Sequence, residues 1–225
     1  ILPESLDKKN RRKFDIKRAN PIGTLMSLKR YPVISGLLIC IVLFNIAQHA
    51  THSTWTFFTI EKFDWSEKLV GYSLGFIGLL AAIVQGGLIR VIIPKLGNIK
   101  SVYFGMIFYI LGLSLFAFAE EEWMVFAFAI PLSLGGISGP ALQGIMTNKI
   151  PDDEQGEFQG GMTSLVSLTA IIGPLLMTNL FSYFTSENSF YYFPGAPFMV
   201  GAIISFFGLI IAVRFLSGSR GGSSI

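Results

Sequence analysis

The sequence has 225 residues, of which 52% are apolar and only 14% are charged. A soluble domain usually carries about 25% charged residues, so this composition indicates a membrane protein. The net charge of +3 does not favour a nucleic-acid partner, because the basic residues lie in loops between apolar segments and not on one soluble surface. The single cysteine, Cys40, excludes a disulfide framework or a cysteine-based metal site within one chain.

The first 31 residues are rich in charge and lack the pattern of a signal peptide. We interpret residues 1–31 as a cytoplasmic interdomain linker, in which Pro21 opens a short helix at the membrane interface. Because the sequence does not begin with methionine, we expect it to be part of a longer protein. The last residues, 218–225, are predicted to form a flexible polar tail.

A helix needs about 20 mostly apolar residues to cross the hydrocarbon core of a membrane. The segments that meet this requirement have no charged residue at their centre and are 33–60, 68–93, 99–119, 123–149, 157–184 and 197–216. Transmembrane β-strands are shorter and alternate apolar with polar residues, so helices are expected here. The predicted fold is an all-α, polytopic membrane protein in which residues 32–217 form a six-transmembrane-helix bundle.

Lysine and arginine are distributed unevenly between the two sides of these segments. Most of them lie within residues 1–31, between the second and third segments, or after the fourth and sixth segments, which all fall on one side. The other side has only Lys62 and Lys68, together with several acidic residues. Short cytoplasmic loops carry an excess of basic residues, so both termini are predicted to be cytoplasmic. The protein itself is predicted to lie in the inner or plasma membrane of the cell.

The segment FNIAQHATHSTW, residues 44–55, places polar side chains inside the first apolar run. On a helix, Gln48 lies at the edge of a sector of about 60° that contains Asn45, His49, His52 and Thr56. Lipid cannot satisfy these groups, so this stripe is expected to face other helices or a water-filled cavity.

The stripe has three interpretations. Its side chains form hydrogen bonds between helices, or they line a cavity for a substrate or a proton, with His49 and His52 as proton-relay candidates because histidine titrates near neutral pH. A metal site is not expected, since two imidazoles without a third ligand do not complete a zinc site. Further candidates for the cavity are polar residues of the later segments, namely Gln85, Gln143, Ser164 and Ser167.

Glycine and proline residues in the fourth and fifth segments are candidates for tight packing or helix bending. They are Gly135, Gly139, Pro140, Gly156, Gly160, Gly173 and Pro174. Catalytic motifs such as GxSxG and HExxH do not occur, and no pair of acids lies within the apolar segments. The sequence therefore predicts neither an enzyme nor a cofactor.

Several motifs occur together in the order found in one family: LPES (2–5), RANP (18–21), FTIEKFDWSEKLVGYSLGFIGLL (58–80), GGISGPALQG (135–144) and EQGEFQGGMTSLVSLTAIIGPLL (154–176). They resemble the C-terminal half of the tetracycline-resistance-type drug:proton antiporters of the major facilitator superfamily. The resemblance covers nearly the whole chain. It implies that the chain supplies helices seven to twelve of an alternating-access exporter, with the first, second, fourth and fifth segments lining a central cavity.

The implied partners are the lipid bilayer, the missing N-terminal six-helix half, a small-molecule substrate and protons. The tetracycline exporters carry an acid in the ninth helix and a histidine in the eighth, and proton-coupled export needs both. By register these positions are Tyr109 and Ala81 here. We therefore expect a different amphipathic or hydrophobic substrate, and a coupling carboxylate in the missing half unless His49 or His52 takes its place. Two alternatives use the same fold: a non-transporting scaffold or sensor, and an uncoupled facilitator or importer.

Overall fold

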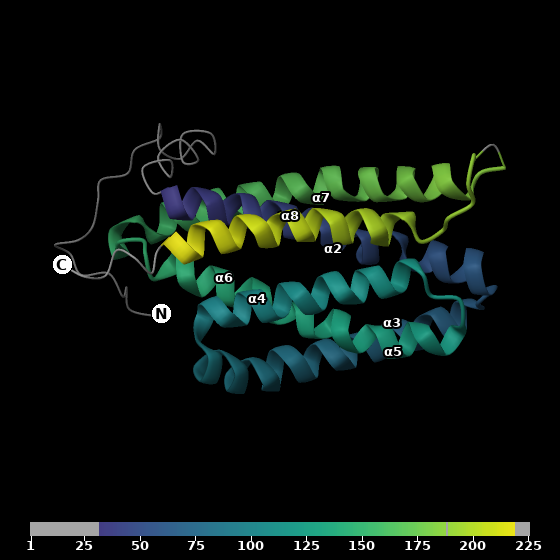
Figure 1. Ribbon diagram of the computed structural model, residues 1–225, viewed down its shortest axis with the longest axis horizontal. Helices are drawn as coiled ribbons and strands as arrows, with labels where there is room; N and C mark the ends of the chain where they lie inside the picture. Colours follow the sequence, from purple (N-terminus) through teal and green to yellow (C-terminus); the bar gives the residue numbers. More distant parts are fainter. Residues whose placement is uncertain (1–31, 188, 219–225) are drawn as a thin grey trace, which may run out of the picture.

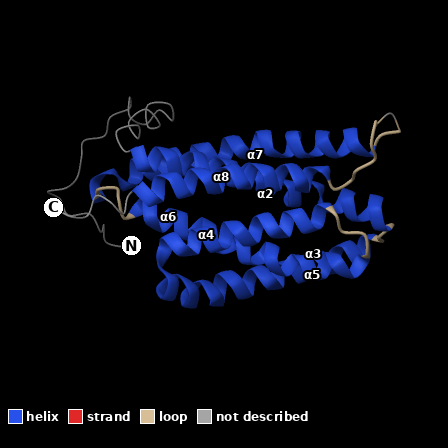
Figure 2. Cartoon of the chain, viewed as in Figure 1, coloured by secondary structure: helices blue, strands red, loops and turns tan. Residues whose placement is uncertain are grey.

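The computed structural model describes residues 32–187 and 189–218, and within these ranges the chain consists of helices and short loops without a strand (Figure 2). In chain order its helical elements are α2 (Pro32–Phe63), α3 (Glu67–Ile83), η2 (Val84–Leu88), α4 (Ile89–Ala117), α5 (Glu122–Leu134), η3 (Gly135–Ile137), α6 (Ser138–Thr147), η4 (Asp152–Glu154), α7 (Gln155–Thr185) and α8 (Ala196–Gly218). The predicted all-α membrane bundle is confirmed. The expected linker and its interfacial helix lie outside the described residues, as does the expected tail beyond Gly218.

In the described part of the chain, 5 helical stretches are long and apolar enough to cross a membrane, where the sequence predicts six. The difference arises because Glu67–Ala117, which holds the predicted second and third segments, forms one stretch of 51 residues. Gly97 interrupts this stretch with φ 76° and ψ 160°, a conformation that glycine adopts at little cost. Figure 1 shows the chain reversing direction between α3 and the greater part of α4. Pro94, one residue beyond the predicted second segment, lies inside the helix.

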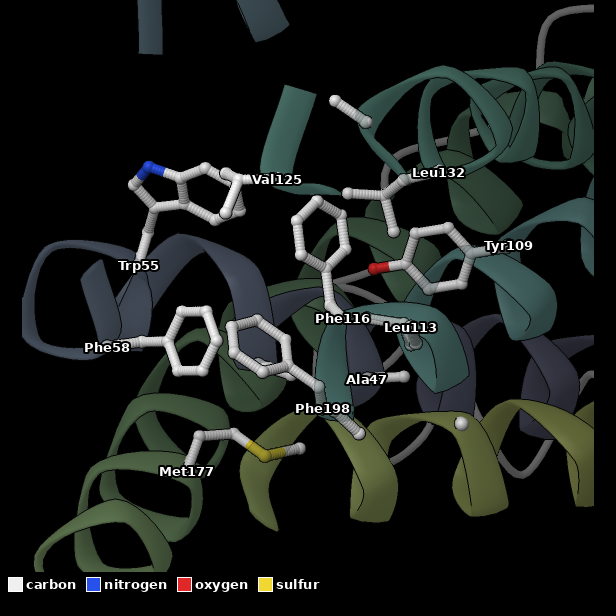
Figure 3. Close-up of a cluster of buried hydrophobic side chains, with 14 of the residues drawn as sticks. Ala47, Trp55, Phe58, Tyr109, Leu113, Phe116, Val125, Leu132, Met177 and Phe198 are labelled. Atoms are coloured by element: carbon white, nitrogen blue, oxygen red, sulfur yellow. The ribbon is translucent and has the colours of Figure 1, made fainter. Parts of the chain in front are cut away.

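The helices lie side by side, and successive long helical segments run in opposite directions (Figure 1). α2 packs against α7 and α8, and α4 packs against α5 and α8. An aromatic cluster joins three of these helices (Figure 3): Trp55 and Phe58 come from α2, Phe116 from α4 and Phe198 from α8. The ring centroids of Phe58 and Phe198 are 4.8 Å apart and those of Trp55 and Phe116 are 5.2 Å apart, so both pairs contribute favourable aromatic contacts.

Glycines bring α4 close to α5 and η3. A Cβ atom added at Gly112 would lie 2.7 Å from the backbone of Leu132, and one added at Gly135 would lie 2.5 Å from the Cβ of Tyr109. Any larger side chain would force the helices apart at these positions. The absence of side chains at Gly112 and Gly135 therefore allows α4 to pack closely against α5 and η3.

α3 is packed less tightly within this chain, since only Val70 and Ser73 of this helix are buried. The indole Nε1 of Trp55 donates a hydrogen bond of 3.0 Å to the hydroxyl of Ser73, which itself donates to the carbonyl of Val70 at 2.7 Å. The bond from Trp55 ties α3 to α2, whereas the bond from Ser73 to Val70 stays within α3. The Trp55–Ser73 bond thereby positions α3 beside α2.

Candidate functional site

A cavity of about 540 Å³ lies between α2, α3, η2, α4, α5 and η3. Its polar lining comes mainly from α2, with contributions from η2 and α5: Gln48, Thr51, His52, Thr56, Gln85 and Ser133. Its aromatic lining consists of Phe44, Trp55 and Tyr109. Small-molecule sites usually measure about 300–1,000 Å³ and combine apolar walls with a few polar groups. The cavity has the size and chemistry to hold a small amphipathic molecule.

One face of α2 forms much of this lining. Gln48, His52 and Trp55 follow each other at intervals of four and three residues, which places them on the same side of a helix. Trp55 is buried and bonded to α3, whereas His52 is exposed within this chain. The α2 face therefore offers a fixed indole ring beside an accessible imidazole.

Tyr109 lines the cavity from α4, beside Phe44 of α2. Its ring centroid lies 4.8 Å from that of Phe44, and its side chain packs against Gly135. Figure 3 shows Tyr109 beside Leu132, another residue of the cavity lining. The close contact at Gly135 holds the tyrosine ring in place.

The residues described as lining the cavity include no aspartate, glutamate, lysine or arginine. Tyr109 and Ala81, the positions at which the resemblance places an acid and a histidine, are both among them. Among the described lining residues, His52 is the only histidine, the side-chain type whose ordinary pKa is closest to neutral. Within the described ranges, no three His, Cys, Asp or Glu side chains come together as a metal site requires.

The structure divides the polar stripe predicted on α2. His52, Thr56 and Gln48 line the cavity, but Asn45 and His49 do not. Asn45 donates from Nδ2 to the carbonyl of Ile41 at 2.9 Å, within its own helix.

The ring of His49 points toward α7, since a Cβ at Gly173 would overlap it. Its Nδ1 lies 3.5 Å from the hydroxyl of Ser53. The His49 and His52 rings are arranged edge to face with centroids 6.3 Å apart. The two histidines therefore face different neighbours, one the cavity and the other α7.

The other polar candidates are distributed differently. Gln85 lines the cavity, whereas Gln143, Ser164 and Ser167 do not. Ser164 donates to the carbonyl of Gly160 at 2.9 Å, within α7. The roles predicted for these residues remain predictions.

The glycine and proline candidates also fall into different environments. Gly135 and Gly173 contact side chains of other helices, but a Cβ at Gly139, Gly156 or Gly160 would meet no described atom within 4 Å. The fourth segment changes from α to 3₁₀ winding at η3, which precedes Pro140. α7 remains helical through Gly173 and Pro174.

Among the lining residues whose side chains can form hydrogen bonds, four were not selected as candidates from the sequence: Thr51, Trp55, Tyr109 and Ser133. Thr51 and Trp55 lie three and seven residues after Gln48, so the helical period could have included them. Tyr109 carried a signal only through the resemblance. The Ser133 hydroxyl is buried and has no hydrogen-bond partner among the described residues, a property that only the packed helices reveal.

These features define an integral, multi-pass membrane protein with a polar and aromatic cavity inside its helical bundle. Residues 91–224 match the model of the Major Facilitator Superfamily, and the chain belongs to this family.

The chain is similar to tetracycline resistance protein, class C, of Escherichia coli, with 30% identity over 204 residues, which are 91% of this chain and 50% of that protein. It is 38% identical over 149 residues to the class E protein of Escherichia coli, covering 66% of this chain and 37% of the relative. A match to Hippocampus abundant transcript-like protein 1 of Homo sapiens has 25% identity over 233 residues, 94% of this chain and 46% of the relative. The chain spans half or less of the length of these relatives.

Proposed function

We propose that this chain is the C-terminal half of a secondary active transporter that exports amphipathic small molecules in exchange for protons. The observation that carries the proposal is the cavity of about 540 Å³, in which amide, hydroxyl and imidazole groups stand beside aromatic rings. Such a mixture binds a molecule that has both apolar and hydrogen-bonding surface. The similarity to tetracycline resistance proteins supports drug-like compounds as the substrate class.

Alternating access follows from the architecture that we propose, in which two six-helix bundles form one transporter. A second six-helix bundle closes the open side of the cavity, and rocking of the two bundles exposes the substrate to one side of the membrane at a time. In this arrangement both ends of the chain face the cytoplasm.

His52 is the group of this half that we assign to proton coupling. It lines the cavity, and histidine is the side-chain type whose ordinary pKa is closest to neutral, so a proton on its ring would change the charge beside the substrate. No carboxylate is found among the described lining residues, and a coupling acid therefore lies in the other half. His49 lies one helical turn away against α7 and is a weaker candidate for the relay.

The test is uptake of compounds into everted membrane vesicles that contain the full-length protein. An imposed pH gradient, acid inside, should drive accumulation of at least one lipophilic drug in a panel that includes tetracycline, and a protonophore should abolish it. Vesicles without the protein provide the background. Accumulation that persists unchanged without the gradient would exclude proton-coupled export.

An uncoupled facilitator is the second candidate, and the uncharged lining of the cavity favours it. A facilitator equilibrates its solute without accumulating it. The same vesicles therefore distinguish the two functions, because the facilitator speeds entry with and without the pH gradient to the same final level.

A further inference from the structure

A second cavity, of about 500 Å³, lies at the end of the bundle where the chain reverses between α3 and the greater part of α4. The segment around the Gly97 kink contributes to its lining, as do the end of α6 and the two residues that follow this helix (Figure 1). We call it the basic pocket, because Lys100 and Lys149 both line it. The basic pocket shares no lining residue with the cavity around His52.

The polar side chains of the basic pocket favour an anion. They are two ammonium groups and two amides, from Lys100, Lys149, Asn98 and Asn148. Ammonium and amide groups donate hydrogen bonds to phosphate and carboxylate oxygens. The acidic residues of η4, Asp152–Glu154, follow Lys149 in the sequence but do not line the pocket. Lys149 also interacts with another residue of the protein, so the charge of Lys100 is the one on which the test below is built.

Apolar side chains border the same pocket. Leu96, Ile99 and Ile145 line it together with the lysines. Leu96 is 41% exposed, and Lys100 is exposed as well. A ligand that contacts both residues carries a negative charge next to an apolar part. Phospholipids have this combination, whereas inorganic phosphate lacks the apolar part.

The position of the basic pocket also favours a lipid. Gly97 lies between two runs that are each long enough to cross a membrane, so the turn around it lies near the boundary between hydrocarbon and water. The distribution of basic residues predicts that this side is cytoplasmic. Anionic lipids give the cytoplasmic leaflet a negative surface potential, and basic pockets between helices on that side bind lipid headgroups.

We propose that the basic pocket binds the phosphate headgroup of an anionic phospholipid from the cytoplasmic leaflet. Lys100 and Lys149 face the phosphate, the amides of Asn98 and Asn148 donate further hydrogen bonds to its oxygens, and Leu96 contacts the start of the acyl chains. The bound lipid thereby bridges the turn at Gly97 and the end of α6. This site does not depend on the transport function proposed above.

The experiment measures the thermal stabilisation of the purified full-length protein in neutral detergent as phosphatidylglycerol is added, and an apparent affinity follows from its concentration dependence. Phosphatidylcholine with the same acyl chains is the control for a lipid without net charge. Inorganic phosphate and glycerol 3-phosphate present the anion without acyl chains. Phosphatidylglycerol should act at concentrations at least about tenfold lower than phosphatidylcholine, and the two soluble phosphates should not stabilise the protein at those concentrations.

Lys100→Gln should weaken phosphatidylglycerol binding by about fivefold, the expected effect of removing one basic residue next to an anionic lipid. Lys100→Arg keeps the charge and should bind as the wild type does. Lys95→Gln is the matched control, because it removes the same charge from the same turn at an exposed residue outside the pocket. Its affinity should change by less than about twofold, since water and salt screen that charge.

Asn148→Asp is a second, independent variant. It replaces an amide of the pocket with a carboxylate of nearly the same shape and so places a negative charge beside the phosphate. The preference for phosphatidylglycerol over phosphatidylcholine should disappear, while the affinity for phosphatidylcholine should stay the same. The melting temperature without lipid shows for each variant whether the fold is retained.

Equal losses from Lys100→Gln and Lys95→Gln would show that only the general surface charge attracts the lipid, and would overturn the proposed site. Equal stabilisation of the wild type by the two lipids, or none by phosphatidylglycerol, would also overturn it. Stabilisation by either soluble phosphate at the concentrations at which phosphatidylglycerol acts, with the same dependence on Lys100, would identify a site for a free phosphate and overturn the lipid assignment. The vesicle experiments on export are unaffected by any of these results.

Discussion

The hydrogen bond between Trp55 and Ser73 should make a measurable contribution to stability, because it joins α2 to the loosely packed α3. Both residues are buried, with exposed fractions of 2% and 1%. Hydrogen bonds between membrane helices contribute about 0.6 kcal/mol on average and up to about 1.7 kcal/mol. Burial places this bond in the upper part of that range, so we expect a coupling energy of about 1 kcal/mol.

The coupling energy is measured by a double-mutant cycle with Trp55→Phe and Ser73→Ala. The phenylalanine keeps a ring that can pack against Phe116 but has no donor, and the alanine leaves the indole N–H without its acceptor. The latter change should cost about 1–3 kcal/mol by itself. Unfolding of the full-length protein in mixed micelles, followed by the loss of helical circular dichroism, gives each free energy.

A control cycle uses Trp123→Phe and Ser164→Ala. Trp123 is 62% exposed, and Ser164 bonds only within its own helix, so their coupling should be close to zero. If the Trp55–Ser73 cycle gives the same value as this control, the bond does not tie α3 to α2. Ser73 would then not hold the α3 wall of the cavity in place.

Three further results are expected. Gly135→Ala should destabilise the protein by about 1–3 kcal/mol in the same unfolding assay, because the added methyl group overlaps an aromatic side chain of α4; unchanged stability would contradict the packing described. His52→Gln should flatten the pH dependence of export more than His49→Gln, since only His52 lines the cavity; equal profiles would argue against this assignment. Outside the membrane-spanning helices, Tyr192 donates a 3.0 Å hydrogen bond to Glu61, and partial burial, this bond and the Glu61 charge raise the pKa of Tyr192. The contact between neutral Tyr192 and Glu61 stabilises the folded protein fully below the ordinary tyrosine pKa of about 10, and this stabilisation is lost as pH rises through the raised pKa. Tyrosinate absorbance should therefore show one tyrosine that ionises at higher pH than the others, and Tyr192→Phe should remove it.

The helices could be predicted from the sequence because each membrane crossing requires a long apolar run. The expected start at Pro32 agrees with the first residue of α2, and Gly97 makes the kink between the second and third predicted segments. The π winding of η2 and the 3₁₀ winding of η3 were not predicted. Such changes depend on how neighbouring helices pack, and the composition of Val84–Leu88 or Gly135–Ile137 does not specify them.

Only part of the cavity lining could be predicted from the sequence. The angular position of a residue on a helix identifies its face, but it does not identify the neighbour that this face meets or the depth of the site. Asn45 lies on the same side of α2 as His52, yet it is almost two turns nearer the start of the helix and outside the cavity. His49 occupies the edge of the stripe, where the close approach of Gly173 brings α7 against its ring.

Proton antiport is tested most directly by measuring whether added compounds collapse an imposed pH gradient. Everted vesicles that contain the full-length protein are given an acid interior, and a panel of lipophilic compounds including tetracycline is added while a fluorescent dye reports internal pH. If the protein exchanges drugs for protons, at least one compound should collapse the gradient only when the protein is present, and His52→Gln should reduce this collapse. No collapse with any compound, from protein shown to be folded, would contradict proton-coupled export.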